Sequence, residues 1–315
     1  MTWWRRILQP SARFILAIAV AGPVCPGVLA QAPDVPIYKQ GRKESEQEDK
    51  ISAAAKELYR GGRAANLEEI KEQLKRNSCR LSLPEVANKK LSPREICINA
   101  RRSHLRVGWC YLCGKCDQWH VNLAGGYTIT ANGAVATCYH VVQPGKEVKE
   151  GCLVAADEDG RVFAVKEVLA ANRYADACIV VIDAKDFVPL PLNTNVYPGD
   201  IAYCFSDPQD HRGYFSHGVV NRFYQFPGRR PVSAAPSAAY APTRLNVSTD
   251  WAPGSSGSAV LDEFGNAIGH VSTISVIEDE ESTEADKPNA SGPTMIVFHE
   301  AVSAKDVLRL INTPE

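Results

Sequence analysis

The chain has 315 residues and a formal net charge of −1, and 45% of its residues are hydrophobic. This is the composition of a folded globular protein, and it excludes a disordered or collagen-like chain. The near balance of charges gives no electrostatic reason to expect nucleic acid as a partner. The length suits about two domains or lobes.

The first 30 residues have the three parts of a secretory signal. Three arginines precede an apolar run of 11 residues, Phe14 to Val24, and the small residues of Val28 to Ala30 then offer a cleavage site. A helix needs roughly 20 apolar residues to cross a bilayer, so this run is too short to span one. We therefore expect a signal peptide over residues 1–30, a periplasmic or secreted protein, and no membrane partner after cleavage. An uncleaved anchor is the alternative.

Residues 31–103 are charged and patterned for helices. Glu44 to Tyr59 predicts one helix, Asn66 and Glu69 form a capping box for a second, and Ser92 to Glu95 gives a third start with proline at the first helical position. We expect a helical N-terminal extension. Packing on the outside of a larger domain is the favoured role of these helices, and binding a partner is the alternative.

From residue 104 to about residue 300 the sequence predicts short strands separated by turn residues. The clearest are 127–130, 134–137, 162–168, 177–182, 201–205, 217–223, 258–261, 267–275 and 294–298. Many short strands without helices between them indicate a β-barrel or a β-sandwich. Ser303 can cap a final helix over 303–311. The acidic run Glu278 to Asp286 is typical of a solvated loop.

Three segments carry side chains suited to nucleophilic catalysis. His140 stands where a β-run ends, and Asp176 immediately precedes a fully apolar strand, which would partly desolvate its carboxylate. Ser256 lies in the loop Gly254-Ser255-Ser256-Gly257-Ser258, whose glycines can leave a serine hydroxyl exposed and turn backbone N–H groups inward. A serine hydroxyl needs a neighbouring base to act as a nucleophile at neutral pH.

These segments resemble the chymotrypsin-like (trypsin-fold) serine proteases. The matching motifs are Thr137-x-x-His140, Asp176-Ala177-Cys178-Ile179 and Gly254 to Ala259. They follow in the order His, Asp, Ser, at intervals of 36 and 80 residues. Other folds with this triad use other orders. With Pro253 before the last motif, the chain looks most similar to the bacterial exported branch that includes the HtrA-type proteases.

The resemblance implies an all-β core of two six-stranded antiparallel β-barrels, with the N-terminal helical extension and a C-terminal helix. We expect a trypsin-like domain over 104–315. Barrel one, about 104–190, would carry His140 and Asp176, and barrel two, about 195–300, would carry Ser256. Only 59 residues follow Ser256, so we expect no PDZ module after it. The implied function is an exported serine endopeptidase that acts on protein or peptide substrates and needs no cofactor.

The resemblance also assigns roles to residues. His140, Asp176 and Ser256 would be catalytic, and the N–H groups of Gly254 and Ser256 would form the oxyanion hole. Asp250 and Ser272 would bind substrate. Asp250 stands where trypsin-like enzymes place the acid that binds Arg or Lys, but the neighbouring Trp251 could fill the pocket, so basic specificity stays open.

Ser255 stands where trypsin zymogens have an aspartate that pairs with a newly cut N-terminus. A serine cannot form that ion pair, so we expect no activation of the trypsin type. The alternative function for the whole chain is a non-catalytic binding or chaperone-like protein on the same fold.

The cysteines permit several interpretations. Cys110-x2-Cys113-x2-Cys116-x3-His120 has spacing that suits zinc, and His104 is near in sequence. Export would favour disulfides instead, joining for example Cys79 or Cys97 to this segment. We therefore expect disulfides rather than a metal, with zinc and unpaired thiols as alternatives. Cys138 and Cys178, beside the catalytic motifs, are expected to be small buried hydrophobic residues.

Overall fold

The computed structural model describes residues 35–38, 42–185, 187–226, 241–278 and 294–312. The expected signal peptide and nearly all of the acidic run lie outside these residues. The chain divides into two compact units, 1–37 and 38–315. In the first unit only Val35 to Ile37 are described, and they are exposed and form no helix or strand. Among the described helices, none has the length and apolar character to cross a membrane.

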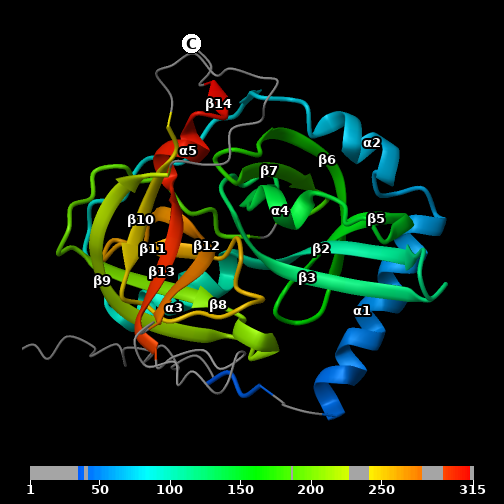
Figure 1. Ribbon diagram of the computed structural model, residues 1–315, viewed down its shortest axis with the longest axis horizontal. Helices are drawn as coiled ribbons and strands as arrows, with labels where there is room; N and C mark the ends of the chain where they lie inside the picture. Colours follow the sequence, from blue (N-terminus) through cyan, green and yellow to red (C-terminus); the bar gives the residue numbers. More distant parts are fainter. Residues whose placement is uncertain (1–34, 39–41, 186, 227–240, 279–293, 313–315) are drawn as a thin grey trace, which may run out of the picture. The chain divides into compact units, whose positions relative to one another are not determined.

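The second unit contains two closed β-barrels (Figure 1). The first is built from β2 (His104–Cys113), β3 (Trp119–Thr128), β4 (Ala134–Thr137), β5 (Val148–Ala156), β6 (Val162–Asn172) and β7 (Ala177–Ile182), in the order β2-β3-β4-β7-β6-β5. The second is built from β8 (Ile201–Ser206), β9 (Tyr214–Gln225), β10 (Thr243–Val247), β11 (Ala259–Leu261), β12 (Ala267–Glu278) and β13 (Thr294–Ser303), in the order β10-β13-β12-β11-β8-β9. Neighbouring strands are antiparallel throughout. The predicted fold class is confirmed.

The N-terminal helices pack on the barrels. They are α1 (Arg42–Arg60), α2 (Leu67–Gln73) and α3 (Pro93–Ser103). Asn66 and Ser92 form the predicted capping boxes at the starts of α2 and α3. Buried Ile51 of α1 lies in one apolar cluster with Leu123 and Val154 of the first barrel, and Ile96 of α3 packs with residues of both barrels. These helices therefore pack on the outside of the barrels, as expected.

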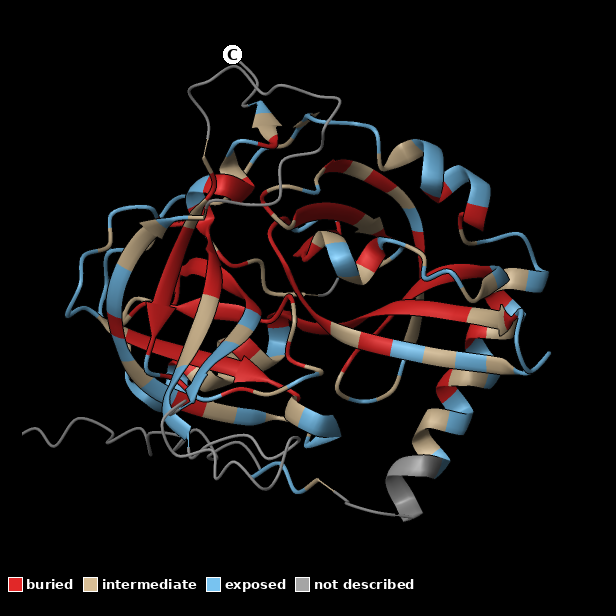
Figure 2. Cartoon of the chain, viewed as in Figure 1, coloured by how far each residue is buried: buried red, intermediate tan, exposed pale blue. Residues whose placement is uncertain are grey.

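A single apolar cluster joins the two barrels. It contains Tyr127 and Ile179 of the first barrel and Phe205 and Leu261 of the second, all at most 2% exposed. Figure 2 shows buried residues along the strands of both barrels and exposed residues along the outer helices. Since burial of apolar surface is the main favourable contribution to folding, this shared cluster fixes how the barrels face each other.

The C-terminal helix is shorter than the sequence predicts. Ser303 caps α5 (Ala304–Leu308) as expected. The chain then leaves the helix, and β14 (Ile311–Asn312) pairs in parallel with β1 (Cys79–Arg80). The predicted end of the helix at residue 311 is therefore wrong. The backbone N–H of Cys79 donates to the Leu310 carbonyl at 2.8 Å, so strand pairing with the N-terminal extension replaces the last helical turn.

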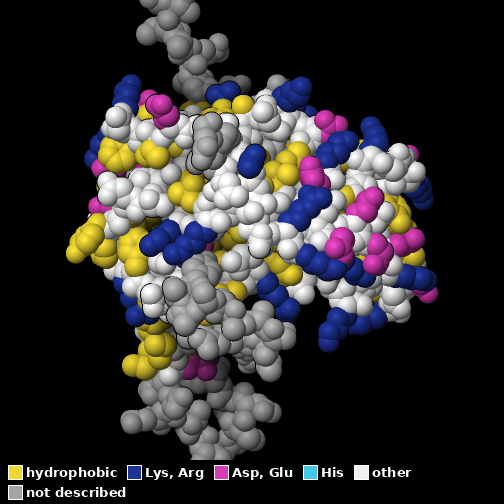
Figure 3. All heavy atoms as spheres, turned by 90° about the horizontal axis from the view of Figure 1, so that it is seen from above, with side chains coloured by type: hydrophobic (Ala, Val, Ile, Leu, Met, Phe, Trp, Pro, Cys, Tyr) yellow, Lys and Arg dark blue, Asp and Glu magenta, His cyan; other side chains and the backbone are white. Residues whose placement is uncertain are grey.

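Charges of both signs are mixed on the surface of the barrels and helices. On α2, Lys71 pairs with Glu68 one turn before it, and just beyond the helix Lys75 pairs with Glu72. Figure 3 shows basic and acidic side chains interspersed on the face seen from above. This distribution agrees with the net charge of −1.

Candidate functional site

The candidate residues come from three connections and one strand of the two barrels. His140 lies on the short helix α4 (Tyr139–Val142) after β4, and Asp176 lies in the turn between β6 and β7. Both belong to the first barrel. In the second barrel, Ser256 lies in the connection from β10 to β11, and Ser272 lies on β12.

Asp176 holds the imidazole of His140 through several contacts. His140 Nδ1 lies 3.0 Å from each carboxylate oxygen of Asp176, and the backbone N–H of His140 donates to Oδ1 at 3.1 Å. A ring nitrogen facing a carboxylate carries the proton. Nδ1 of His140 is thus the protonated nitrogen, and Nε2 has no hydrogen-bond partner among the described residues. The side chain of His140 is 48% exposed, which leaves Nε2 accessible.

The Asp176 carboxylate also connects the two barrels. Ser272 Oγ donates to Asp176 Oδ2 at 2.7 Å. Burial would raise the pKa of Asp176, but the hydrogen bonds from His140 and Ser272 and the nearby imidazole outweigh it and lower the pKa to about 2. Asp176 is therefore ionised at neutral pH, and it can stabilise a positive charge on His140.

The turn before Asp176 is fixed locally. Asn172 Oδ1 accepts hydrogen bonds from the backbone N–H groups of Tyr174 and Ala175, at 2.9 and 3.0 Å. Arg244, from the second barrel, donates to the Ala175 carbonyl at 2.8 Å. Asp176 itself has φ +59°, a left-handed conformation that Asp tolerates better than most residues. These contacts aim its side chain at His140 and Ser272.

Ser256 lies next to Ser272, whose hydroxyl contacts Asp176. Ser256 Oγ lies 3.5 Å from the Ser272 carbonyl oxygen, and within the described residues it forms no direct hydrogen bond with His140. The Ser256 carbonyl accepts a hydrogen bond of 2.6 Å from the Gly125 N–H on β3. A Cβ at Gly125 would lie 2.0 Å from Ser258 Oγ, so the serine loop docks on the first barrel only because residue 125 lacks a side chain.

The backbone around Gly254 leaves two N–H groups free. Among the described residues, the N–H groups of Gly254 and Ser256 have no hydrogen-bond partner. The carbonyl of Pro253 accepts from the Gln209 N–H at 2.7 Å. In a trans peptide the carbonyl and the next N–H point in opposite directions, so the Gly254 N–H points away from Gln209. Gly254 has φ +101°, a conformation that glycine adopts without strain.

Sequence analysis missed the residues that support this backbone. A Cβ at Gly254 would lie 2.8 Å from the Asp207 carbonyl, so the Asp207 segment packs directly against it. The buried carboxylate of Asp207 contacts His104 Nε2 at 3.1 Å and accepts from the Gly213 N–H at 2.9 Å. His104 therefore supports this segment, and it does not join the cysteine motif. No local sequence signal pairs residues 104 and 207, which lie 103 positions apart.

Ion pairs extend this support to the N-terminal helix. Arg106, only 4% exposed, lies 3.9 Å from Asp207 and 3.5 Å from Asp210. The same guanidinium contacts Glu48 of α1 at 2.5 Å. α1 is thereby linked through Arg106 to the segment that holds Pro253.

Asp250 lies apart from the contacts described above. It lines a hollow of about 280 Å³ together with residues of β9, β10 and β13, and His140, Asp176 and Ser256 are not among the lining residues. Trp251 is 5% exposed, and its Nε1 donates to the Thr273 carbonyl at 3.3 Å. The Trp251 ring is therefore buried in the apolar cluster of the second barrel.

The cysteines do not form the expected bridges. All nine described cysteines are free thiols. Cys79 and Cys97 pack against the cluster between the barrels, whereas buried Cys110 is paired in register with Cys152 across β2 and β5. Cys138 and Cys178 are at most 1% exposed, and burial raises the pKa of both thiols, so each is a small buried side chain as expected.

Comparison with known proteins places this site in a recognised domain. The model of the trypsin-like peptidase domain matches residues 124–269, a range that includes His140, Asp176 and Ser256. No curated protein sequence matches the chain. The chain thus contains a trypsin-like peptidase domain.

Solved structures of HtrA-type and related proteases are similar to this chain. A serine endoprotease from Yersinia pestis is 16% identical, with a TM-score of 0.45, and the match covers 69% of this chain and 64% of that one. The HtrA-type protease AlgW with a decapeptide is 15% identical, with a TM-score of 0.49, and the match covers 69% of this chain and 66% of that one. The chain spans less than two thirds of the length of either structure.

The site contains a histidine whose burial makes stability depend on pH. His270 is fully buried beside Asp176, and its Nε2 lies 3.2 Å from the Asp176 carbonyl. Burial lowers the pKa of His270 from 6.5 to about 4, despite the opposing Asp176 charge. The unfolded chain binds this proton more tightly, so the free energy of unfolding should fall by roughly 3 kcal/mol as the pH drops from about 6.5 to about 4.

The variant His270→Gln should lose this part of the pH dependence. Urea unfolding of the wild type and the variant between pH 4 and 7.5 measures it. The exposed residue His217 provides the matched control, since His217→Gln should keep the wild-type slope. Equal slopes in the wild type and His270→Gln would contradict the burial of an uncharged imidazole.

Proposed function

We propose that this chain is a serine endopeptidase that hydrolyses peptide bonds in protein or peptide substrates through its trypsin-like peptidase domain. The observation that carries the proposal is the position of Asp176. Its ionised carboxylate holds Nδ1 of His140 at 3.0 Å and the hydroxyl of Ser272 at 2.7 Å. The backbone of Ser272 in turn lies beside the Ser256 hydroxyl.

In this proposal His140 Nε2 acts as the general base. It removes the proton of Ser256 Oγ while that oxygen attacks the substrate carbonyl carbon, and it later gives the proton to the leaving amine. Asp176 keeps the proton on Nδ1 and stabilises the imidazolium that forms. Water then attacks the acyl-enzyme by the same route, which releases the acid and restores Ser256. The mechanism requires Ser256 Oγ to come within hydrogen-bond reach of His140 Nε2, and such catalytic hydrogen bonds often tighten only when substrate is bound.

The two free N–H groups of Gly254 and Ser256 would stabilise the oxyanion. Negative charge develops on the substrate carbonyl oxygen as Ser256 attacks. Donors that are already in place stabilise this charge without reorganisation, and removing one typically costs about 2.7–4 kcal/mol of the barrier. The bond from Gln209 to Pro253 keeps the peptide of Gly254 in the required orientation.

We further propose that the protein is exported and acts in the periplasm or outside the cell. The basic start, the short apolar run and the small residues before Gln31 support this location. Detection of a mature N-terminus at Gln31 in the exported fraction would test it.

Replacement of neighbouring serines tests the proposed nucleophile. A fluorophosphonate probe should label Ser256 of the wild type, and Ser256→Ala should abolish labelling and lower peptide hydrolysis by about 10⁴-fold or more. Mass spectrometry of the labelled peptide identifies the modified residue. His140→Ala should also lose labelling, because the hydroxyl then lacks its base.

Ser255 supplies the matched control. Its side chain is fully buried and its hydroxyl has no partner in the described structure. Ser255→Ala should keep labelling and hydrolysis within about tenfold of the wild type, or 1.4 kcal/mol. Labelling on Ser255, or hydrolysis that persists in Ser256→Ala, would contradict the proposal.

The proposed oxyanion hole is tested by Gly254→Ala. The new Cβ would lie 2.8 Å from the Asp207 carbonyl in a backbone with φ +101°, so the loop must shift. We expect kcat to fall by about 10²–10³-fold, the effect of losing one donor. A matched change on the same surface loop, Ala252→Gly, should have a smaller effect. Unchanged kcat in Gly254→Ala would rule out this pair of donors.

A further inference from the structure

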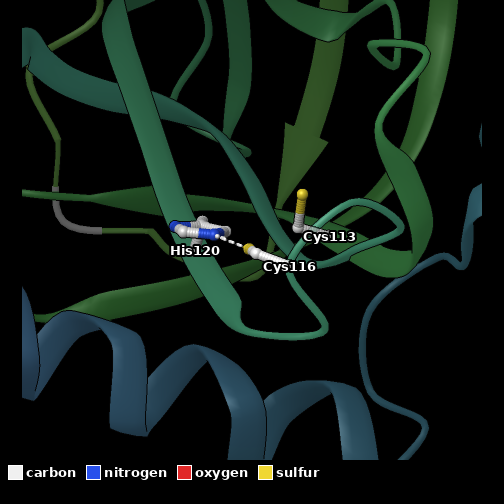
Figure 4. Close-up of side chains that lie close together, drawn as sticks. All are labelled: Cys113, Cys116 and His120. Atoms are coloured by element: carbon white, nitrogen blue, oxygen red, sulfur yellow. Dashed lines mark hydrogen bonds between the residues drawn. The ribbon is translucent and has the colours of Figure 1, made fainter.

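The turn between β2 and β3 gathers three potential metal ligands. Cys113, Cys116 and His120 each contribute one ligand atom, and these atoms lie within 4.8 Å of one another. Figure 4 shows the Cys116 sulfur directed at the His120 ring, and Sγ lies 3.1 Å from Nε2. None of these residues contributes to the proposed catalytic site.

Position along β2 separates the members of the longer cysteine motif. Cys113 is the last residue of β2, beside the turn, where the pairing with β5 shifts its register. Cys110 is buried in an apolar cluster with Cys152. His104 lies at the far end of β2, against Asp207. Only Cys113 is then left on the strand to join Cys116 and His120.

Backbone hydrogen bonds fix the conformation of the turn. The Asp117 N–H donates to the Cys113 carbonyl at 2.9 Å, and Asp117 adopts φ +52° to close the turn. The Gly114 N–H donates to the Glu147 carbonyl at 2.8 Å, which ties the turn to the β5 side of the barrel. The Lys115 N–H points at Cys113 Sγ at 3.4 Å, a contact that favours a thiolate over a thiol.

The donor set and its spacing suit zinc. Zinc prefers cysteine sulfur and histidine nitrogen, at about 2.3 and 2.0–2.1 Å. Two sulfurs on one tetrahedral zinc ion are therefore about 3.8 Å apart, and a sulfur and a nitrogen are slightly closer. The ligand atoms here already lie within 4.8 Å, so side-chain rotations bring them to these distances. Because Cys116 and His120 are exposed, the site is open to solvent. Water would complete the tetrahedron.

We propose that Cys113, Cys116 and His120 form a zinc-binding site on the β2–β3 hairpin. The two thiolates balance the charge of the divalent ion, and His120 binds through Nε2. The site requires reduced cysteines. It does not depend on the proposed peptidase activity, since its ligands and its readouts are separate from Ser256.

Metal titration of the full chain tests the site. The protein is reduced, stripped with a chelator and titrated first with Co²⁺ and then with Zn²⁺. We expect one ion per chain, a thiolate-to-cobalt charge-transfer band, visible bands of tetrahedral cobalt, and loss of all of them when zinc displaces cobalt. Cys116→Ser and His120→Ala should each weaken zinc binding by about 100-fold or more.

The matched controls are Cys97→Ser and His217→Ala, which remove the same residue types elsewhere and should bind zinc as the wild type does. Alkylation provides a second readout in the unmutated protein: zinc should protect Cys116 from iodoacetamide and leave the rate at Cys97 unchanged. The proposal is overturned if the reduced wild type binds no zinc, or if Cys116→Ser and His120→Ala bind it normally. A Cys113–Cys116 disulfide that forms equally fast with and without saturating zinc would also overturn it.

Discussion

The candidate site depends on the hydrogen bonds of the Asp176 carboxylate. This carboxylate belongs to the first barrel, yet it accepts a hydrogen bond of 2.7 Å from Ser272 of the second barrel while it holds His140. Further contacts cross between the barrels close by, from Arg244 to the Ala175 carbonyl and from Gly125 to the Ser256 carbonyl. A relative shift of the barrels by about 1 Å would break these bonds and change the position of His140 relative to Ser256. The shared apolar core therefore also fixes the geometry of the candidate site.

Much of the fold was predictable because its signals are local. Strands β4 and β7 are short apolar runs with turn residues on both sides, and their predicted bounds are correct. The caps at Asn66 and Ser92 are equally local, since each depends on residues within three positions. Strands β2, β5 and β10 escaped prediction, because Gly108, Gly151 and Asn246 interrupt their apolar patterns. The pairing of β1 with β14 joins segments far apart in the chain, so no local signal indicates it.

The candidate site also contains residues that the sequence could indicate and residues that it could not. The motifs around His140, Asp176 and Ser256 are contiguous, so a family resemblance could indicate them, and the structure brings His140 and Asp176 into direct contact. The support of Gly254 by Asp207, and the link from Asp207 through Arg106 to Glu48, join residues that are distant in sequence and carry no motif. The cysteine motif needed the structure, because Cys110 packs in an apolar cluster whereas Cys113 lies at the end of β2, near Cys116 and His120. The roles of the supporting residues and of the cysteines therefore depend on contacts between segments that are distant in sequence.

The protonation state of His140 tests the central claim most directly. Asp176 should hold the proton on Nδ1 and leave Nε2 free to act as a base. Nitrogen NMR of protein with ¹⁵N-labelled histidine, assigned with His140→Ala, distinguishes the two neutral tautomers above the pH at which the ring is charged. The account predicts the Nδ1–H form in the wild type and a shift towards the Nε2–H form in Asp176→Asn. A wild-type His140 in the Nε2–H form would contradict it.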